Sequence, residues 1–182
     1  MLTLILGGAR SGKSRLAQRL ASATTDVTYV ATYREGHDPE MRERVERHRA
    51  SRPAAWRTIE EPIAIADAVE AVAGHGLVIV DCLTIWLSNL FWEHRDGPTR
   101  DVEEIVSAQL ERIAAAARGC RVILVSNEVG SGTVPDHRVS RAFRDVHGWL
   151  NQKAAAAADE VILAVAGLPL YLKTASAAEV GR

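Results

Sequence analysis

The sequence contains only two cysteines, Cys82 and Cys120, among its 182 residues, and the two lie far apart. A zinc site needs several closely spaced ligands, and no such spacing is present. Each cysteine lies in or beside an apolar run. We therefore expect two buried free thiols in a reducing compartment.

The sequence also lacks an excess of charge of either sign and lacks long apolar runs. Its net charge is −1, from 22 basic and 23 acidic residues, so no overall basic field would attract nucleic acid or anionic lipid. The apolar run Leu2 to Leu6 is too short to cross a membrane, and no positively charged segment precedes it as in a signal peptide. These features predict a soluble cytoplasmic protein without a nucleic-acid partner or a membrane span.

The remaining composition is ordinary for a globular protein, with 47% hydrophobic and 25% charged residues. The length is sufficient for one sizeable core, and no internal repeat divides it. We therefore expect a single domain over residues 1–182.

Apolar runs that suit buried strands alternate with helical patterns along the chain. This alternation predicts an α/β fold with a mostly parallel sheet that helices cover on both faces. The expected strands are Leu2 to Leu6, Val27 to Ala31, Leu77 to Val80, Arg121 to Val125 and Glu160 to Val165. The expected helices are Lys13 to Ala23, Asp38 to Ala50, Pro62 to Ala73, Leu83 to Trp92, Val102 to Ala117 and Val139 to Ala158. The tail after Lys173 is expected to fray.

The first expected strand leads into the pattern G-x-x-x-x-G-K-S, which ends at Ser14. This is the phosphate-binding loop (P-loop) pattern. Gly7 and Gly12 allow a tight turn whose backbone N–H groups converge on a phosphate. Lys13 adds a positive charge for the β- and γ-phosphates, and Ser14 offers a hydroxyl to Mg²⁺. The following helix directs its positive N-terminal end at the same phosphates.

These features predict a P-loop NTPase-like (RecA-like) fold, with a mostly parallel sheet flanked by helices. The alternative is a glycine-rich turn between strand and helix that binds nothing.

An acidic residue, Asp81, ends the apolar run that begins at Val78. In P-loop enzymes an acid at this place holds Mg²⁺, directly or through water. The alternative is that Asp81 caps the helix expected to begin at Leu83. We favour the metal role because a bound triphosphate needs a cation.

The segment from Asp38 to Trp56 is rich in arginine and contains one histidine, His48. Its arginines are at positions 42, 44, 47, 49 and 52. On the expected helix, His48 shares the inward stripe with Met41 and Val45. His48 therefore either packs the helix against the sheet or acts as a nucleophile beside a cationic patch that holds phosphates. Neighbouring arginines disfavour the protonated imidazole, and attack on phosphorus requires the neutral form.

The segment after the fourth expected strand, Ser126 to Gly130, does not match the asparagine–lysine–x–aspartate pattern of guanine-specific switch proteins. Glu128 is either a base or ligand, or a polar cap. The next expected helix carries Arg138, Arg141 and Arg144 at a spacing of three. This basic face either binds phosphate or is simply solvated.

Several motifs, in order and spacing, resemble one enzyme family over about residues 2 to 173. They are GGARSGKS at the start, YVAT at 29–32, HRxxRP at 48–53, WRTIE at 56–60, VDCLT at 80–84, VSNEVG at 125–130 with Val134-Pro135, RxFRD at 141–145, NQ at 151–152 and ADEV at 158–161. The chain resembles the bifunctional adenosylcobinamide kinase/adenosylcobinamide-phosphate guanylyltransferase family of cobalamin biosynthesis. The P-loop alone would not single out this family, but its combination with the His48 segment and the SNEVG loop is specific.

The resemblance implies two reactions. GTP or ATP first phosphorylates the aminopropanol hydroxyl of adenosylcobinamide. GTP then reacts with a histidine to give a guanylylated enzyme and pyrophosphate, and GMP passes to the cobinamide phosphate, giving adenosyl-GDP-cobinamide. The resemblance also implies a homotrimer.

The resemblance assigns roles to individual residues. The guanylylated histidine falls on His48; some members carry two adjacent histidines there, whereas Arg47 precedes His48 here. The P-loop pattern itself makes Lys13 the second expected catalytic residue and Ser14 and Asp81 the expected metal ligands; several family members have glutamate where Asp81 stands. The implied nucleotide contacts are Gly7, Gly8, Ala9, Arg10, Ser11, Gly12, Lys13, Ser14, Ala31, Thr32, Tyr33, Arg49, Ala50, Ser51, Arg52, Glu60 and Asp81.

The pocket for the corrinoid substrate must accept a large, flat and partly apolar ligand. Trp86, Trp92 and Trp149 are candidates for its walls, although buried tryptophans more often belong to a core.

Two other functions fit the same motifs. A small-molecule kinase with a single reaction would use His48 for packing and form no covalent intermediate. A nucleotide-dependent switch or partition-type ATPase would act through a protein partner and would favour a long exposed loop. The expected loops are Tyr33 to His37, Glu93 to Arg100 and Asn127 to His137, and the last two are modest in length.

Overall fold

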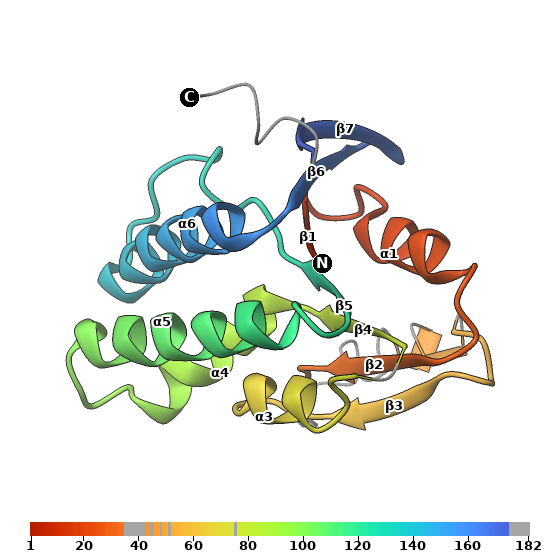
Figure 1. The fold of residues 1–182 in the computed structure, drawn as a ribbon. Helices are drawn as coiled ribbons and strands as arrows, with labels where there is room; N and C mark the ends of the chain where they lie inside the picture. Colours follow the sequence, from red (N-terminus) through yellow and green to blue (C-terminus); the bar gives the residue numbers. More distant parts are fainter. Residues whose placement is uncertain (35–42, 44–45, 48, 51, 75, 175–182) are drawn as a thin grey trace, which may run out of the picture.

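The computed structural model describes residues 1–34, 43, 46–47, 49–50, 52–74 and 76–174 (Figure 1). Within them the elements are β1 (Leu2–Leu6), α1 (Lys13–Ala21), β2 (Val27–Ala31), β3 (Arg57–Glu60), α3 (Ile65–Glu70), β4 (Leu77–Asp81), α4 (Leu83–Glu93), α5 (Thr99–Ala116), β5 (Arg121–Val125), α6 (Arg138–Ala157), β6 (Glu160–Val165) and β7 (Leu168–Lys173).

Seven strands form one sheet in the order β3-β2-β4-β5-β1-β6-β7. All neighbouring strands are parallel except β6 and β7, which are antiparallel. The predicted α/β fold with a mostly parallel sheet is confirmed. In such a sheet the carboxyl ends of the parallel strands lie along one edge, where ligands bind.

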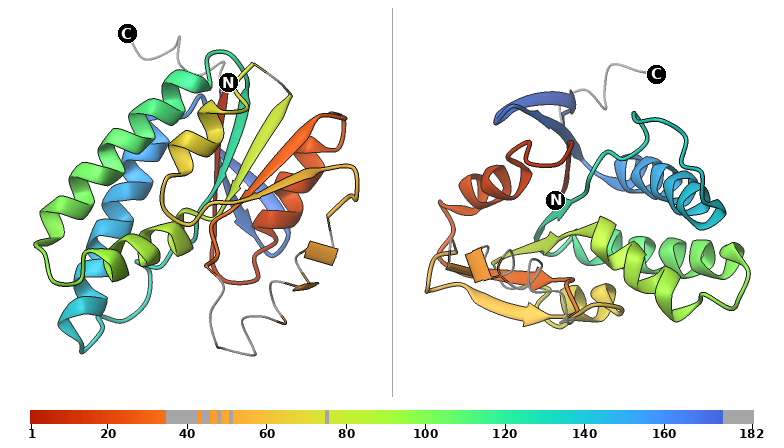
Figure 2. Two further views of the ribbon diagram at one scale, coloured as in Figure 1. Left: turned by 90° about the horizontal axis from the view of Figure 1, so that it is seen from below. Right: turned by 180° about the vertical axis from the view of Figure 1, so that it is seen from behind.

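Helices cover both faces of the sheet. α3, α4, α5 and α6 lie on one face and α1 on the other, as the two further views show (Figure 2). Successive strand side chains point to opposite faces, so Val78 and Val80 of β4 pack toward α3–α6, whereas Leu77 and Ile79 pack on the α1 side. Strands buried on both faces explain the continuous apolar runs in the sequence.

Two strands, β3 and β7, were not predicted. β3 is four residues long and mostly exposed, and β7 is exposed at nearly every position and contains Pro169. Both lie at the edges of the sheet. Edge strands need not be apolar and tolerate proline, so no apolar run indicates them.

Helix boundaries differ from the predictions at several ends. α5 begins at Thr99, three residues before the predicted start, because its first turn is polar and Pro98 takes the position before it. α3 is only six residues long. It begins late because the Glu61 carboxylate accepts hydrogen bonds from the backbone N–H groups of Ile63 and Ala64, which form a turn there.

The helix predicted over Asp38 to Ala50 falls partly outside the described residues. Its described members (43, 46, 47, 49 and 50) are helical. The tail after Lys173 was predicted to fray, and from residue 175 onward it also lies outside the described residues. No helix in the described part of the chain has the length and apolar character needed to cross a membrane. Both cysteines are free thiols, with Cys120 buried and Cys82 half-buried.

Candidate nucleotide-binding site

The register of the sheet brings several of the predicted site residues to its carboxyl edge. Ile5 pairs with Val125, Val125 pairs with Asp81, and Asp81 pairs with Ala31. The P-loop begins two residues after Ile5. It therefore lies at the same edge as Asp81 and as the segments that follow β2 and β5.

The P-loop backbone has a shape that requires its two framework glycines. Gly7 has φ 154°, and a Cβ atom there would lie 2.4 Å from the carbonyl oxygen of Ala164. Gly12 has φ 95° and occupies the N-cap of α1, and its Cβ would lie 3.1 Å from Cα of Gly167. Both positions combine a positive φ with close neighbours, so a side chain at either would distort the loop. The N-terminal end of α1 faces into the loop and favours an anion there.

Two side chains in the P-loop have polar atoms suited to phosphate. Lys13 is buried, and its Nζ donates to the carbonyl oxygen of Gly8 at 2.6 Å. Oγ of Ser11 is buried and has no hydrogen-bond partner among the described residues. A buried hydroxyl without a partner costs free energy, and a phosphate oxygen in the loop would satisfy it.

Asp81 ends β4 next to a buried tyrosine. The hydroxyl of Tyr29 donates to Oδ2 of Asp81 at 2.5 Å. Burial and the Asp81 charge raise the pKa of Tyr29, so it stays protonated and remains a donor. The alternative role of Asp81 as a helix cap is wrong: the N-cap of α4 is Cys82, and no side chain caps that helix.

The residues after His48 reach the same region through two contacts. The guanidinium of Arg52 lies over the ring of Tyr29, 3.7 Å from its centroid, and Nε of Arg52 is buried without a hydrogen-bond partner among the described residues. Nη1 of Arg49 lies 4.0 Å from Oε1 of Glu60, at the end of β3. The arginines are therefore close to the Tyr29–Asp81 pair and to another predicted contact, Glu60. His48 and Ser51 lie outside the described residues.

Thr32, after β2, is fully buried, and its hydroxyl is used by the fold. Oγ1 donates to the carbonyl oxygen of Cys82 and accepts from the backbone N–H of Cys82, both at 2.8 Å. Its hydroxyl thus joins the ends of β2 and β4. Its neighbours Ala31 and Tyr33 are half-buried. Burial, with a contribution from the Asp81 charge, raises the pKa of the Cys82 thiol to about 11.

The loop after β5 uses its charged side chains to hold its own backbone. Oε1 of Glu128 accepts from the N–H groups of Gly130 and Ser131 at 2.6 and 3.0 Å, so Glu128 is a polar cap. Arg141 donates to the carbonyl oxygens of Pro135 and Asp136, and Arg144 to that of Thr133. At least two of the three helix arginines therefore hold this loop.

A buried polar network beneath this loop was not anticipated. His147 of α6 is fully buried, and its Nε2 lies 2.9 Å from Oγ1 of Thr84, which also accepts from the N–H of Asn127 at 2.9 Å. Asn151 accepts from the Ser126 hydroxyl at 2.7 Å and donates to the Asn127 carbonyl oxygen at 2.9 Å. The sequence signal is two polar residues four apart on the inward face of a helix, which is where apolar residues are expected.

This network holds the loop after β5 against the P-loop. Glu128, the residue after Asn127, donates its backbone N–H to the carbonyl oxygen of Gly7 at 2.9 Å. Burial lowers the pKa of His147, although the Glu128 charge acts in the opposite direction, so the ring is neutral.

The three candidate tryptophans have different environments. Trp86 is fully buried, and its indole N–H donates to the carbonyl oxygen of Ile63 at 2.8 Å, so it belongs to the core. Trp149 is partly buried against the core, with Lys153 over its ring. Trp92 lines a cavity between α4 and α6.

The donor set at this edge suits a magnesium nucleotide. Mg²⁺ is bound in such sites by one or two protein oxygens together with phosphates and water. The Ser14 hydroxyl and the Asp81 carboxylate provide such oxygens. Among the described residues no cluster of three or more histidines, cysteines or acidic residues could hold a metal by itself.

A parallel sheet with a glycine-shaped P-loop after one strand and an acid at the end of another defines a P-loop NTPase-like protein. The family can be stated more closely. The chain belongs to the cobinamide kinase / cobinamide phosphate guanyltransferase family, whose model matches residues 3–172. It is accordingly an enzyme of a bifunctional kinase and guanylyltransferase family.

Curated relatives agree with this assignment. The chain is 51% identical over 177 residues to the bifunctional adenosylcobalamin biosynthesis protein CobP of Pseudomonas aeruginosa, covering 95% of this chain and 98% of that protein. It is 38% identical over 182 residues to the bifunctional adenosylcobalamin biosynthesis protein CobU of Escherichia coli K12, covering 95% of this chain and all of that protein.

Solved structures match the fold at much lower identity. A structure described as a prototypical ATPase from the type III secretion system of pathogenic bacteria has a TM-score of 0.59 and 14% identity. The match covers 93% of this chain and 56% of that chain. This likeness shows the shared fold alone.

Proposed function

We propose that the chain phosphorylates adenosylcobinamide with GTP or ATP and then transfers GMP from GTP, through a covalent guanylyl-histidine at His48, to adenosylcobinamide phosphate. The product is adenosyl-GDP-cobinamide. The observation that carries this proposal is the family match over residues 3–172, which includes both the P-loop and His48.

The first reaction is a phosphoryl transfer. The aminopropanol hydroxyl attacks the γ-phosphorus and releases its proton to water, the bond to the β-phosphate oxygen breaks, and GDP or ADP leaves. Catalysis of such a step depends on positioning and on stabilising negative charge. The P-loop N–H groups and Lys13 supply that stabilisation, and the unpartnered Ser11 hydroxyl supports the placement of phosphate there.

The second reaction brings two anions together, which a covalent intermediate makes easier. A nitrogen of neutral His48 attacks the α-phosphorus of GTP, and pyrophosphate leaves. A phosphate oxygen of the corrinoid then attacks the same phosphorus, and the histidine nitrogen leaves. The proximity of Arg49 and Arg52 to Tyr29 and Glu60 supports a cationic setting for this step.

We assign the nucleotide contacts to the positions that the resemblance implies, from Gly7 to Ser14, from Ala31 to Tyr33, from Arg49 to Arg52, and at Glu60 and Asp81. Ser14 and Asp81 would hold Mg²⁺, which when bound neutralises charge on the phosphates. The hydrogen bond from Tyr29 would orient the Asp81 carboxylate toward it. Thr32 is the contact whose side chain is least available, because the fold already uses its hydroxyl.

We propose further that residues 1–182 form one domain that works in the cytoplasm as a homotrimer. The exposed face of β7 supports a subunit contact, because Leu168 is 71% exposed and Leu170 and Leu172 are about half exposed. Contiguous exposed apolar side chains of this kind mark association surfaces. Light scattering of the purified protein measures the number of subunits directly.

The proposed function is tested by incubating the protein with adenosylcobinamide, Mg²⁺ and either GTP or ATP, and by following corrinoid products by mass spectrometry. GTP should give first the phosphate and then the GDP adduct, whereas ATP should give only the phosphate or nothing. Formation of the phosphate with GTP, without any GDP adduct, would indicate a kinase with a single reaction. Nucleotide turnover without any corrinoid product would contradict both.

A further inference from the structure

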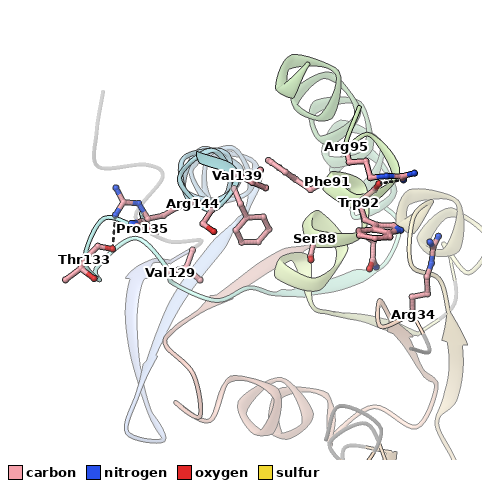
Figure 3. Close-up of a pocket in the computed structure, with 13 residues that line it drawn as sticks. Arg34, Ser88, Phe91, Trp92, Arg95, Val129, Thr133, Pro135, Val139 and Arg144 are labelled. Carbon is pink, nitrogen blue, oxygen red and sulfur yellow. Dashed lines mark hydrogen bonds between the residues drawn. The ribbon is translucent and has the colours of Figure 1, made fainter. Parts of the chain in front are cut away.

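A large cavity opens on the α3–α6 side of the sheet, next to its carboxyl edge. Its volume is about 830 Å³, within the range of small-molecule sites. It lies between α4 and α6, and is completed by the loop after β5 and by Arg34, which follows β2 (Figure 3). None of the described residues assigned to the nucleotide lines it.

The floor of this cavity is apolar and the opening is wide. Phe91 of α4 and Phe143 of α6 pack edge to face, with ring centroids 5.5 Å apart. Trp92 and Val139 lie in the wall, 65% and 70% exposed to solvent. Such exposure of large apolar side chains around one cavity is typical of a binding surface, and the wide opening suits a ligand that is flat.

Polar and charged side chains surround this floor. Ser88, Thr133 and Ser140 provide hydroxyl groups. Figure 3 shows Arg34 and Arg95 beside Trp92 at one end, and Arg144 beside Thr133 at the other. Each of these arginines has an acid beside it at the rim: Glu93 lies 2.5 Å from Arg34, Asp96 3.8 Å from Arg95 and Asp145 3.9 Å from Arg144. Among the described residues that line the cavity itself, the charged side chains are all arginines.

Two positions in the cavity lining connect it to the proposed nucleotide site. Val129 lines the cavity, while the residue before it, Glu128, donates its N–H to the carbonyl oxygen of Gly7 at 2.9 Å. Asn89 also lines the cavity, and its amide donates to the carbonyl oxygen of Thr32 at 2.8 Å. A ligand in the cavity would therefore lie beside the proposed nucleotide.

Buried contacts between α4 and α6 hold the cavity in shape. The contact of 2.9 Å between Thr84 of α4 and His147 of α6 joins its two helical walls, and the Phe143 ring lies 5.7 Å from the His147 ring. A preformed site loses less entropy when its ligand binds.

From these observations we infer that this cavity is the acceptor site, which holds the corrinoid of cobinamide and of cobinamide phosphate beside the nucleotide. The inference rests on the proposed function. The flat, largely hydrocarbon macrocycle lies on Trp92, Phe143 and Val139, its amide side chains meet the hydroxyl and amide groups, and the arginines favour the phosphate of the second acceptor.

The test measures how tightly corrinoids bind to variants in which the cavity is filled or loses part of its wall. Ser140→Trp places a large side chain in the opening, and Trp92→Ala removes a wall. The matched control is Ala115→Trp, at an exposed position of α5 outside the cavity. Equilibrium dialysis with cobinamide and with cobinamide phosphate gives Kd, GTP binding checks that each variant is folded, and light scattering gives the oligomeric state.

We expect each cavity variant to raise both corrinoid Kd values about tenfold or more, and Ala115→Trp to leave them unchanged. Raising the salt concentration to about 0.5 M should weaken binding of cobinamide phosphate more than that of cobinamide. Wild-type affinity in both variants would overturn this placement and leave the proposed function intact. A wild-type protein that binds neither corrinoid would overturn the proposed function. A change of oligomeric state in the cavity variants would show instead that a second copy of the chain covers this surface.

Discussion

The hydroxyl of Tyr29 donates a hydrogen bond of 2.5 Å to the carboxylate of Asp81. Tyr29 pairs with Ile79 in the neighbouring strand, so its side chain reaches diagonally along the sheet to the last residue of β4. Arg52 lies over the opposite end of this contact, on the tyrosine ring. A buried tyrosine thus links the proposed metal ligand with the arginine-rich segment that contains His48.

We predict that Tyr29→Phe leaves Asp81 without its orienting donor. Loss of a hydrogen-bond donor that orients a metal ligand lowers metal affinity or activity by about 10- to 100-fold. The cost in free energy of unfolding should be only about 1 kcal/mol, because one hydrogen bond is lost and the ring is kept. Kinase rates at a series of Mg²⁺ concentrations measure the first effect, and urea unfolding measures the second.

Tyr171→Phe is the matched control for this change, because the Tyr171 side chain is about half exposed on β7. It should behave as wild type in both measurements. Kinase rates for Tyr29→Phe that match wild type at every Mg²⁺ concentration would show that Tyr29 does not position Asp81 for the reaction.

Lys13→Ala should impair both reactions, because one P-loop serves both nucleotides in this account. Loss of one charged contact to the transition state lowers the rate by at least about a hundredfold. The measurements are kinase turnover and the rate of enzyme guanylylation. Lys153→Ala, which removes an exposed lysine on α6, is the control. Normal guanylylation by Lys13→Ala would mean that the guanylyl donor binds at a separate site.

The buried network around His147 predicts a pH dependence of stability. Burial lowers the pKa of His147 in the folded protein, so the unfolded chain binds a proton more readily. The contribution of the neutral ring to stability is therefore complete above the unfolded pKa of about 6.5 and is lost as the pH falls below it. Urea unfolding at pH values on either side of 6.5 should show this loss in wild type.

His147→Gln keeps a polar side chain but cannot titrate, so its unfolding free energy should change less over the same pH interval. An equal change in wild type and variant would assign the pH dependence to other groups. Glu128 is the charged group whose field acts on His147, and Glu128→Gln should lower the pKa of His147 further.

The sequence predicts the buried strands of this fold well because both of their faces are covered. β2, β5 and β6 begin and end at the predicted residues, since their apolar runs are bounded by polar or turn residues. The exposed edge strands β3 and β7 cannot be predicted in this way, because they form backbone hydrogen bonds with a neighbouring strand without burying their side chains.

The part of the candidate site that consists of consecutive residues could be predicted from the sequence. The P-loop from Gly7 to Ser14 is a continuous pattern, and Gly7 and Gly12 have the positive φ values that the pattern requires. The contact of Tyr29 with Asp81 could not be predicted, because it depends on which strands are neighbours and in which register. The same is true of Thr84 and His147, which lie 63 positions apart in sequence.

The central claim is a covalent GMP group on His48, and intact-mass measurement after incubation with GTP and Mg²⁺ tests it most directly. Wild type and the control His94→Ala should both gain the mass of one GMP, while His48→Ala should gain none and keep most of its kinase activity. A GMP adduct on His48→Ala, or a wild-type protein that makes the GDP adduct of cobinamide without ever carrying GMP itself, would contradict the account.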